Sequence, residues 1–413
     1  MLEPLAGIVD TAFIGHLGPK SLAALGVGVS VFNSFFWVFN FLVHIPMESV
    51  ARGAVKGKES SITQARVGLL SSILVGLLSF LFLFSFSESL LRFAGAQPET
   101  FNLSREYYFY RVFGQPIVLV YFCLLSILRG IGLSKQSLIP VFLSVGINIF
   151  LTFILIFHFD LGVKGAAIGT VTSYLVGLLV TVFLLFKEVG KELFIFRKLP
   201  AKDSFFSFSE KSLFLFVRSF CLTGIFFLST KIAAEIGVYS ISAYQIALQF
   251  WLFSSFFLDG LAMTGNIETA KLSAAKNSSQ FLDFSRQLFS LSFGIGFIFM
   301  SVYFLFENQL FSLFTSDELV LENLRLIWPI VLGGQVVNAL AFSIDGVYFG
   351  LGRHSRLAVM MILNLMFIFL PMAIYGLHQG SLQILLLALL FTSIFRWFYL
   401  KKYLYDDFDS QSV

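Results

Sequence analysis

The segment that decides the fold is the first eighteen residues, Met1-Leu-Glu-Pro-Leu-Ala-Gly-Ile-Val-Asp10-Thr-Ala-Phe-Ile-Gly15-His-Leu-Gly18. It is an apolar run with one carboxylate, Asp10, set inside it. An ionisable side chain among membrane-spanning helices is costly, and it usually faces a polar cavity or an ion path. If the rest of the chain is membrane-embedded, Asp10 is therefore a candidate ion-coupling carboxylate of a transporter.

The remaining sequence has the composition of a membrane protein. Of its 413 residues, 57% are hydrophobic and 13% are charged, whereas soluble domains carry about 25% charged residues. The apolar residues are grouped in windows of roughly 20, long enough for a helix to cross a hydrocarbon core of about 30 Å. Lipid offers the backbone no hydrogen-bond partners, so we predict an all-α integral membrane protein.

We predict about twelve membrane-spanning helices. They cover approximately residues 1–15, 22–51, 66–89, 102–128, 137–157, 165–186, 211–230, 240–266, 284–306, 321–348, 357–376 and 381–400. The first has about fourteen residues and would span roughly 21 Å at 1.5 Å per residue, which is less than the hydrocarbon core. We expect that the sequence begins inside this helix, which is then truncated at its N-terminus.

Basic residues are distributed unequally between alternate loops. One set of loops carries about twenty lysines and arginines, among them Lys187 to Lys211 and Arg396 to Lys402, and the other set carries about seven. Cytoplasmic loops are enriched in basic residues. This bias predicts a multi-pass protein of the cell (inner) membrane with both termini in the cytoplasm.

The two halves of the sequence resemble each other at a nearly constant offset of about half the chain. The matching pairs are Gly18–Ala24 with Gly237–Ala243, Lys58–Ser61 with Lys276–Ser279, and Gly130–Gly132 with Gly350–Gly352. A repeat of six helices returns the chain to the same side of the membrane, so the halves have the same orientation. We predict an N-lobe over 1–187, a cytoplasmic linker over 188–210 and a C-lobe over 211–413.

Polar groups in the first half suggest a cavity lining. Asn148 and Thr152 lie four residues apart and would share one helix face, and Gln115 lies within the apolar helix predicted over 102–128. His44 and Glu48 are also four apart; they could form a polar lining or a proton relay, but pairing of Glu48 with Arg52 is the favoured interpretation.

The helix predicted over 102–128 begins with a cluster of aromatic residues and one arginine, Tyr107-Tyr-Phe-Tyr-Arg111. We interpret these tyrosines as part of the aromatic belt at the outer interface, with cavity lining as the alternative. Small residues from Gly165 to Gly169 indicate close helix packing.

The second half carries its own intramembrane charges. Arg218 either extends its charge to the interface or holds a carboxylate, while Asp259 and Asp345 either couple an ion or lock helices together. We favour a structural or gating role for both acids. The candidate cavity or substrate residues are thus Asn148, Thr152, Gln115, Asn338 and Asp345, and the candidate gating or structural residues are Arg129, Arg218, Asp259, Glu48 and His44.

Motifs of soluble enzymes are missing from the sequence. There is no G-x-x-x-x-G-K-[ST] phosphate loop, so we expect an ion gradient instead of ATP hydrolysis as the energy source. Cys123 and Cys221 fall inside apolar helices, and the five histidines have no metal-binding spacing. We expect no enzymatic activity, metal, cofactor or nucleic-acid partner.

The first helix resembles a known signature. Pro4-Leu-Ala-Gly-Ile-Val-Asp10-Thr-Ala-Phe-Ile-Gly15-His-Leu-Gly18 is similar to the first-helix motif of the MATE (multidrug and toxic compound extrusion) transporters, with most similarity to the DinF-like branch. Further similar segments are Tyr108–Pro116, Leu128–Gly130, Gly165–Gly169, Arg218-Ser219, Leu258–Ala262, Leu313–Thr315 and Ile344–Gly346 with Gly350.

The resemblance implies two pseudo-symmetric six-helix bundles around a V-shaped cleft, and a functional monomer in membrane lipid. It implies antiport, in which a proton or sodium ion enters while a small organic, often cationic, compound leaves. Asp10 matches the N-lobe acid of the family. Burial in a low-dielectric cavity disfavours the charged form of a carboxylate, which lets such a group bind and release a proton.

Three positions depart from the family pattern. Thr152 stands where many members have a second acid, Pro46-Met47 replaces a polar turn, and Asn266 replaces a frequent glutamate. A proton is favoured over sodium as the coupling ion.

The sequence therefore predicts a proton-driven multidrug or organic-cation efflux antiporter. The alternative is a flippase for a lipid-linked oligosaccharide or cell-wall precursor, since the wider superfamily contains such proteins. A membrane scaffold without transport activity is a third hypothesis, which the intramembrane carboxylates disfavour.

Overall fold

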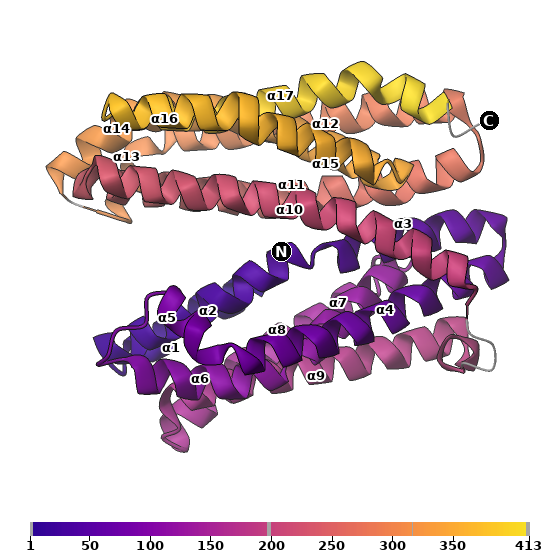
Figure 1. The fold of residues 1–413 in the computed structure, drawn as a ribbon, viewed down its shortest axis with the longest axis horizontal. Helices are drawn as coiled ribbons and strands as arrows, with labels where there is room; N and C mark the ends of the chain where they lie inside the picture. Colours follow the sequence, from indigo (N-terminus) through magenta and orange to yellow (C-terminus); the bar gives the residue numbers. More distant parts are fainter. Residues whose placement is uncertain (1–2, 196–199, 316, 410–413) are drawn as a thin grey trace. The chain divides into compact units, whose positions relative to one another are not determined.

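The structure, a computed structural model, describes residues 3–195, 200–315 and 317–409. Within these ranges the chain forms helices joined by turns, with no strand (Figure 1). The first half contains α1 (Glu3–Gly15), α2 (Pro19–Val38), α3 (Phe41–Lys56), α4 (Lys58–Ser85), α5 (Ser87–Phe93), α6 (Phe101–Phe113), α7 (Gln115–Gly130), α8 (Leu138–Phe153), the π-helix η1 (Ile154–His158) and α9 (Gly162–Val189). The rest contains η2 (Lys191–Phe194), α10 (Lys202–Ile236), α11 (Val238–Ala274), α12 (Ser278–Leu305), α13 (Glu307–Ser312), α14 (Glu318–Leu351), α15 (His354–Leu363), the π-helix η3 (Asn364–Phe369), α16 (Leu370–His378) and α17 (Leu382–Asp409).

These helices make the chain a multi-pass membrane protein. In the described residues, ten helical stretches are long and apolar enough to cross a membrane, or eleven if the bent pair α6–α7 forms one span. The helix α1, with 13 residues, is shorter than these stretches. Each of the twelve predicted helices has a counterpart, which confirms the predicted fold class of about twelve helices.

The predicted helices 102–128 and 22–51 are each divided into two. The predicted helix 102–128 is bent by 46° between α6 and α7, where Pro116 lies near the start of α7. Proline has no backbone N–H, and its ring clashes with the carbonyl four residues earlier, so a continuous helix breaks here. The predicted helix 22–51 is divided at Phe39 and Asn40, where the chain tightens and the Asn40 N–H donates to the Trp37 carbonyl (3.4 Å).

The predicted internal repeat is visible in the lengths and starting points of the helices. Helices α4 and α12 both have 28 residues and begin at Lys58 and Ser278. Helices α9 and α17 also both have 28 residues and begin at Gly162 and Leu382. The two pairs are separated by the same interval along the chain, in agreement with the predicted six-helix repeat. A π-helix forms the end of the fifth predicted helix of the first half, and another lies within the fifth predicted helix of the second half.

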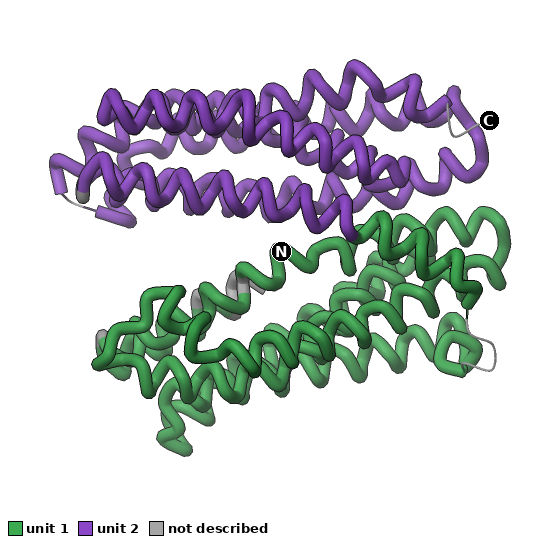
Figure 2. Tube along the Cα trace, viewed as in Figure 1, with its two compact units in different colours: residues 1–212 green, residues 213–413 purple. Residues whose placement is uncertain are grey.

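The chain divides into two compact units, Met1–Ser212 and Leu213–Val413 (Figure 2). The division falls inside α10, near the predicted start of the C-lobe at residue 211. The predicted linker, 188–210, is partly helical, because α10 begins at Lys202. Residues 196–199 of this linker, which include the basic residues Arg197 and Lys198, lie outside the described residues.

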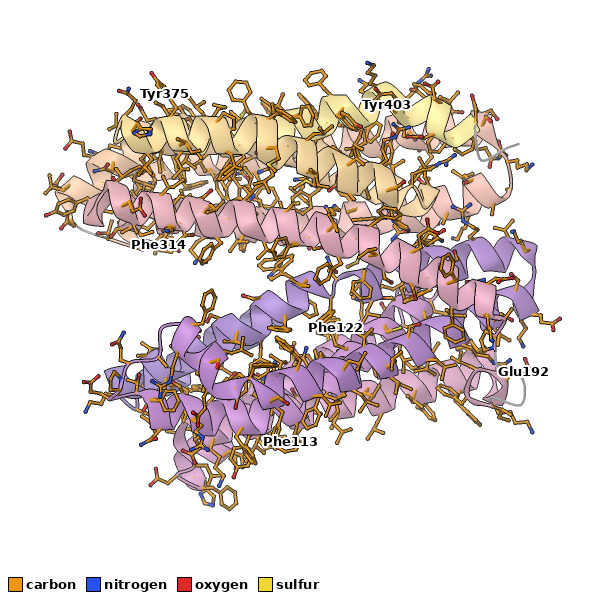
Figure 3. The ribbon with its side chains drawn as sticks, viewed as in Figure 1. Phe113, Phe122, Glu192, Phe314, Tyr375 and Tyr403 are labelled. Atoms are coloured by element: carbon orange, nitrogen blue, oxygen red, sulfur yellow. The ribbon has the colours of Figure 1, made fainter. Side chains whose placement is uncertain are left out.

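Apolar side chains cover the outside of the helices as well as their interior. Exposed phenylalanines such as Phe183, Phe293 and Phe367 are 65%, 53% and 71% accessible, as is expected for lipid-facing positions. Figure 3 labels Tyr375 of α16, which is 58% exposed, and Tyr403 of α17. Exposed tyrosines on membrane helices suit the membrane–water interfaces.

Candidate ion-coupling site

The carboxylate of Asp10 lies inside unit 1, where α1 packs against α8 and α9. Its side chain is 9% exposed. Phe13, one turn further along α1, contacts the rings of Phe153 and Phe157 with centroid distances of 5.8 and 5.7 Å. These edge contacts fix α1 against the end of α8 and the π-helix η1, so Asp10 is held among the polar side chains of α8 and α9.

A short chain of hydrogen bonds surrounds this carboxylate. The Thr170 hydroxyl lies 3.2 Å from Asp10 Oδ2 and 2.8 Å from the carbonyl oxygen of Ala166. Asn148 Nδ2 donates to Thr170 Oγ1 at 3.3 Å and to Thr152 Oγ1 at 3.5 Å. The predicted pair Asn148 and Thr152 therefore does lie beside Asp10. Thr170 was not among the predicted site residues; its place on α9, one residue after Gly169, was the available signal.

Close packing of α8 against α9 forms the floor of the site. A Cβ on Gly169 would lie 2.5 Å from Thr152 Oγ1 and 3.1 Å from the Thr152 backbone nitrogen. A Cβ on Gly165 would lie 3.0 Å from the backbone carbonyl carbon of Leu155. Only glycine lets the two helices approach this closely, which supports the predicted packing role of Gly165 to Gly169.

Two side-chain oxygen atoms at the site can still accept hydrogen bonds. Asp10 Oδ1 and Asn148 Oδ1 are buried and have no hydrogen-bond partner among the described residues. Buried polar atoms without partners are costly, and they mark places where a proton or another group can bind. When Asp10 is protonated, its hydroxyl can donate a hydrogen bond to Thr170 Oγ1. The Thr170 hydroxyl then donates its own hydrogen bond to the Ala166 carbonyl oxygen.

Two tyrosines in the middle of α6 do not fit the predicted interface belt. Tyr107 and Tyr108 are only 4% and 1% exposed, and the Tyr108 hydroxyl donates to the Leu83 carbonyl at 2.8 Å. The interface interpretation is therefore wrong for these two residues. They face the interior because α6 packs against α2 and α9.

Unit 2 contains a second buried charge cluster. Arg218 of α10 and Arg396 of α17 both donate to Asp345 Oδ2 of α14, and the three residues are 7%, 4% and 2% exposed. Arg218 therefore holds a carboxylate, one of its two predicted alternatives. Arg396 was counted among the cytoplasmic loop cations; that interpretation is wrong, since the arginine lies inside the helix bundle.

The other candidates of unit 2 have separate surroundings. Asn338 Oδ1 accepts a hydrogen bond from the Ser393 hydroxyl at 2.6 Å, which joins α14 to α17. Asp259 is half-buried on α11. The structure thus brings Asp345 together with two arginines, while Asn338 and Asp259 take no part in those ion pairs.

The remaining candidates of unit 1 lie away from Asp10. Glu48 is fully buried and forms ion pairs with Arg52 (2.8 Å) and Lys211 (3.0 Å), so the favoured pairing with Arg52 is present. His44, one turn earlier, is 8% exposed.

Two further predicted residues lie at the two ends of α7. Arg129 Nε donates to Ser137 Oγ at 3.2 Å, at the turn between α7 and α8. Gln115 is 3% exposed at the start of α7. Neither residue takes part in the hydrogen bonds of the Asp10 site.

Comparison with known proteins agrees with this architecture. The MatE family model matches residues 1–154 and 215–375. Among curated proteins, Protein DETOXIFICATION 42 of Arabidopsis thaliana is 28% identical, over 87% of this chain and 80% of its own length. Multidrug export protein MepA of Staphylococcus aureus is 26% identical, over 94% of this chain and 87% of its own length.

Solved structures show the same fold. A crystal structure of a MATE protein in the bent conformation superposes with a TM-score of 0.89, covering 100% of this chain and 94% of that one at 20% sequence identity. A MOP superfamily transporter from Pyrococcus furiosus superposes with a TM-score of 0.87 at 19% identity, covering 100% of this chain and 93% of that one.

The fold and the repeat thus define a multi-pass helical membrane protein made of two six-helix halves. The chain belongs to the MatE family, the MATE transporters. Its assignment to the DinF-like branch stays a prediction.

Proposed function

We propose that this protein is a multidrug efflux antiporter of the cell membrane that exports small organic cations in exchange for protons. The observation that carries the proposal is the buried carboxylate of Asp10 with its unpartnered Oδ1 atom. An acidic group kept inside the membrane part of a transporter is expected to serve its ion pathway. The name of the relative MepA, a multidrug export protein, supports the kind of cargo.

In the proposed cycle Asp10 takes a proton from the outer side and releases it to the cytoplasm. Thr170 and Asn148 are placed to stabilise both forms, because the Thr170 hydroxyl can donate to the charged carboxylate or accept from the protonated one. A substrate cation is favoured while Asp10 is charged and disfavoured once it is protonated. Binding of a proton and binding of the cargo cation therefore oppose each other, which is the requirement for antiport.

The aromatic content supports flat organic cations as cargo. The chain contains 54 phenylalanines, and rings stabilise cations that lie over their faces. In unit 2 the carboxylate of Asp345 already pairs with two arginines, so we propose Asp10, not Asp345, as the acid that acts on a cation.

The proposal is tested by uptake of ethidium into inside-out membrane vesicles under an imposed proton gradient and, separately, a sodium gradient. Expected is proton-driven uptake that falls to background in Asp10→Asn. The matched control is Asp160→Asn, an exposed aspartate of the same unit whose φ of 52° is tolerated by asparagine.

Uptake that depends on Asp10 under a sodium gradient alone would replace the proton by sodium as the coupling ion. Lack of uptake under either gradient, or equal uptake by Asp10→Asn, would overturn the proposal. Assays with lipid-linked oligosaccharides would then test the flippase alternative.

A further inference from the structure

We propose that Arg111 is the internal counter-ion of Asp10 and sets the pH range in which Asp10 releases its proton. This inference rests on the proposed function, because it specifies how the coupling carboxylate of that function is controlled. Arg111 is a positioning residue in this role, since it acts through Asp10.

The position of Arg111 follows from contacts on three helices. Its guanidinium lies over the ring of Phe32 on α2 at 5.2 Å and over the ring of Tyr174 on α9 at 5.6 Å. Tyr174 lies one helical turn after Thr170, which contacts Asp10. Residues four apart on a helix are neighbours on one face, so the guanidinium and the carboxylate lie about one turn apart along α9.

Among the described residues the guanidinium forms no ion pair with a carboxylate within salt-bridge distance. Arg111 Nη1 is buried and has no hydrogen-bond partner among the described residues. Two aromatic faces therefore orient the cation, and one of them, Tyr174, lies one helical turn from the residue that contacts Asp10.

Other charged groups on the packed helices point elsewhere. On α8 and α9 the side chains of the Asp10 site are the neutral Asn148, Thr152 and Thr170, and from α6 the Arg111 guanidinium reaches the Tyr174 ring of α9. The remaining nearby ionisable residues are His16, Lys20, Arg105, Glu106 and His158, which are exposed, and Lys164, whose ammonium lies over the Tyr110 ring. In the described part of unit 1, Arg111 is thus the charged group whose contacts place it about one helical turn from the Asp10 site.

The pairing explains how the site works with a single acid. Thr152 carries no charge, so Asp10 and Arg111 together are neutral when Asp10 is deprotonated. A lone carboxylate in a low-dielectric interior would keep its proton. A fixed positive charge nearby lowers the free energy of the charged carboxylate, so the proton can leave at the cytoplasmic side.

The experiment measures ethidium transport by the full chain in inside-out vesicles as a function of the outer pH, which corresponds to the cytoplasmic pH. Removal of the positive charge in Arg111→Gln makes the charged carboxylate less favourable, so a higher pH is needed for proton release. Expected is an alkaline shift of the transport midpoint by about one unit or more.

Two variants separate charge from packing. Arg111→Lys keeps the charge and is expected to keep the midpoint within a few tenths of a unit. Arg92→Gln removes an arginine that lies over Phe101 at the same distance, 5.2 Å, but far along the chain from the site, and it should not move the midpoint. An unchanged midpoint in Arg111→Gln, or an equal shift in Arg111→Lys, would overturn the inference.

A second measurement does not depend on transport. The apparent melting temperature is recorded for the parent protein, Asp10→Asn, Arg111→Gln and the double variant in detergent. Asp10→Asn leaves a buried cation uncompensated, so the double variant should lose less stability than the sum of the single losses. Additive losses would contradict the pairing.

The two proposals fail in different ways. If Asp10→Asn leaves proton-driven transport intact, the proposed function itself fails. If Asp10→Asn abolishes transport while the midpoint of Arg111→Gln stays unchanged, only the counter-ion role fails.

Discussion

At the scale of single residues, the candidate site depends on atoms that small substitutions would move. Thr170 links the Asp10 carboxylate to Asn148, and Gly169 lets Thr152 approach α9. A hydroxyl placed between a carboxylate and an amide can serve as donor or acceptor. The geometry of the site therefore depends on the missing side chain of Gly169 as much as on the polar side chains.

Gly169→Ala is expected to disturb this geometry. The added Cβ would meet Thr152 Oγ1 at 2.5 Å, so α8 and α9 must separate or Thr152 must leave its rotamer, at a cost of about 1–3 kcal/mol. We expect a lower apparent melting temperature and reduced ethidium transport.

The control for this substitution is Gly146→Ala on α8. A Cβ there meets nothing within 4 Å, and alanine stabilises a helix by about 0.5–1 kcal/mol relative to glycine. Equal melting temperatures and transport for both variants would contradict the packing role of Gly169.

At the scale of helices, ion pairs and glycine contacts join the elements of each unit. In unit 2, Asp345 of α14 binds one arginine of α10 and one of α17. A Cβ on Gly346 would lie 2.3 Å from the Ala262 carbonyl oxygen, so α11 and α14 touch at the next residue. The acid and the glycine together explain why the motif Ile344-Asp345-Gly346 occurs inside a membrane helix, toward the C-terminal end of α14.

Asp345→Asn is expected to destabilise unit 2 strongly. Loss of one partner of a buried ion pair costs about 3–5 kcal/mol, because the remaining charge stays buried, and here two arginines remain. Arg396→Gln leaves a one-to-one pair of Arg218 with Asp345 and should lower the melting temperature less.

The exposed Asp283 on α12 is the matched control for this prediction. Asp283→Asn should change the melting temperature little, since exposed charges contribute about 0–1 kcal/mol. A loss in Arg396→Gln as large as in Asp345→Asn would refute the assignment of Asp345 as the centre of the cluster.

At the scale of the whole molecule, two repeated halves make one multi-pass membrane protein. Helices of equal length begin at equivalent positions in the two halves. Repeats that share orientation place equivalent loops on the same side of the membrane. The basic loops of both halves are accordingly proposed to face the cytoplasm together with both termini.

Cysteine labelling tests this orientation. The two native cysteines are buried, at 0% and 6% exposure for Cys123 and Cys221, so background labelling should be low. Ser134→Cys, in the exposed turn after α7, should react with a membrane-impermeant maleimide only from the cytoplasmic side. Gln97→Cys, in the exposed turn after α5, should react only from the outer side.

Labelling of both positions from one side would contradict the topology. The reverse pattern, with Gln97→Cys accessible from the cytoplasm, would invert the orientation derived from the basic loops. Detergent-solubilised protein is the control that both introduced cysteines can react, since both positions should then be labelled.

The sequence by itself determined the membrane class, the twelve helices and the repeat, and it indicated Asp10 as the candidate coupling residue. These features depend on local composition and on chain spacing, because a hydrocarbon core requires about 20 apolar residues per crossing and a repeat leaves matching segments. The face shared by Asn148 and Thr152 was also predictable, since helix periodicity alone sets it.

Only the tertiary structure decided which charges meet. Arg396 is followed closely by Lys401 and Lys402 and looks like a loop cation in the sequence, yet it binds Asp345 of a helix well before it in the chain. Thr170 was missed as a neighbour of Asp10 because the two residues come from helices far apart in the chain. Ion pairs and hydrogen bonds between helices depend on how the helices pack and rotate against each other, and that information is not contained in the periodicity of any one segment.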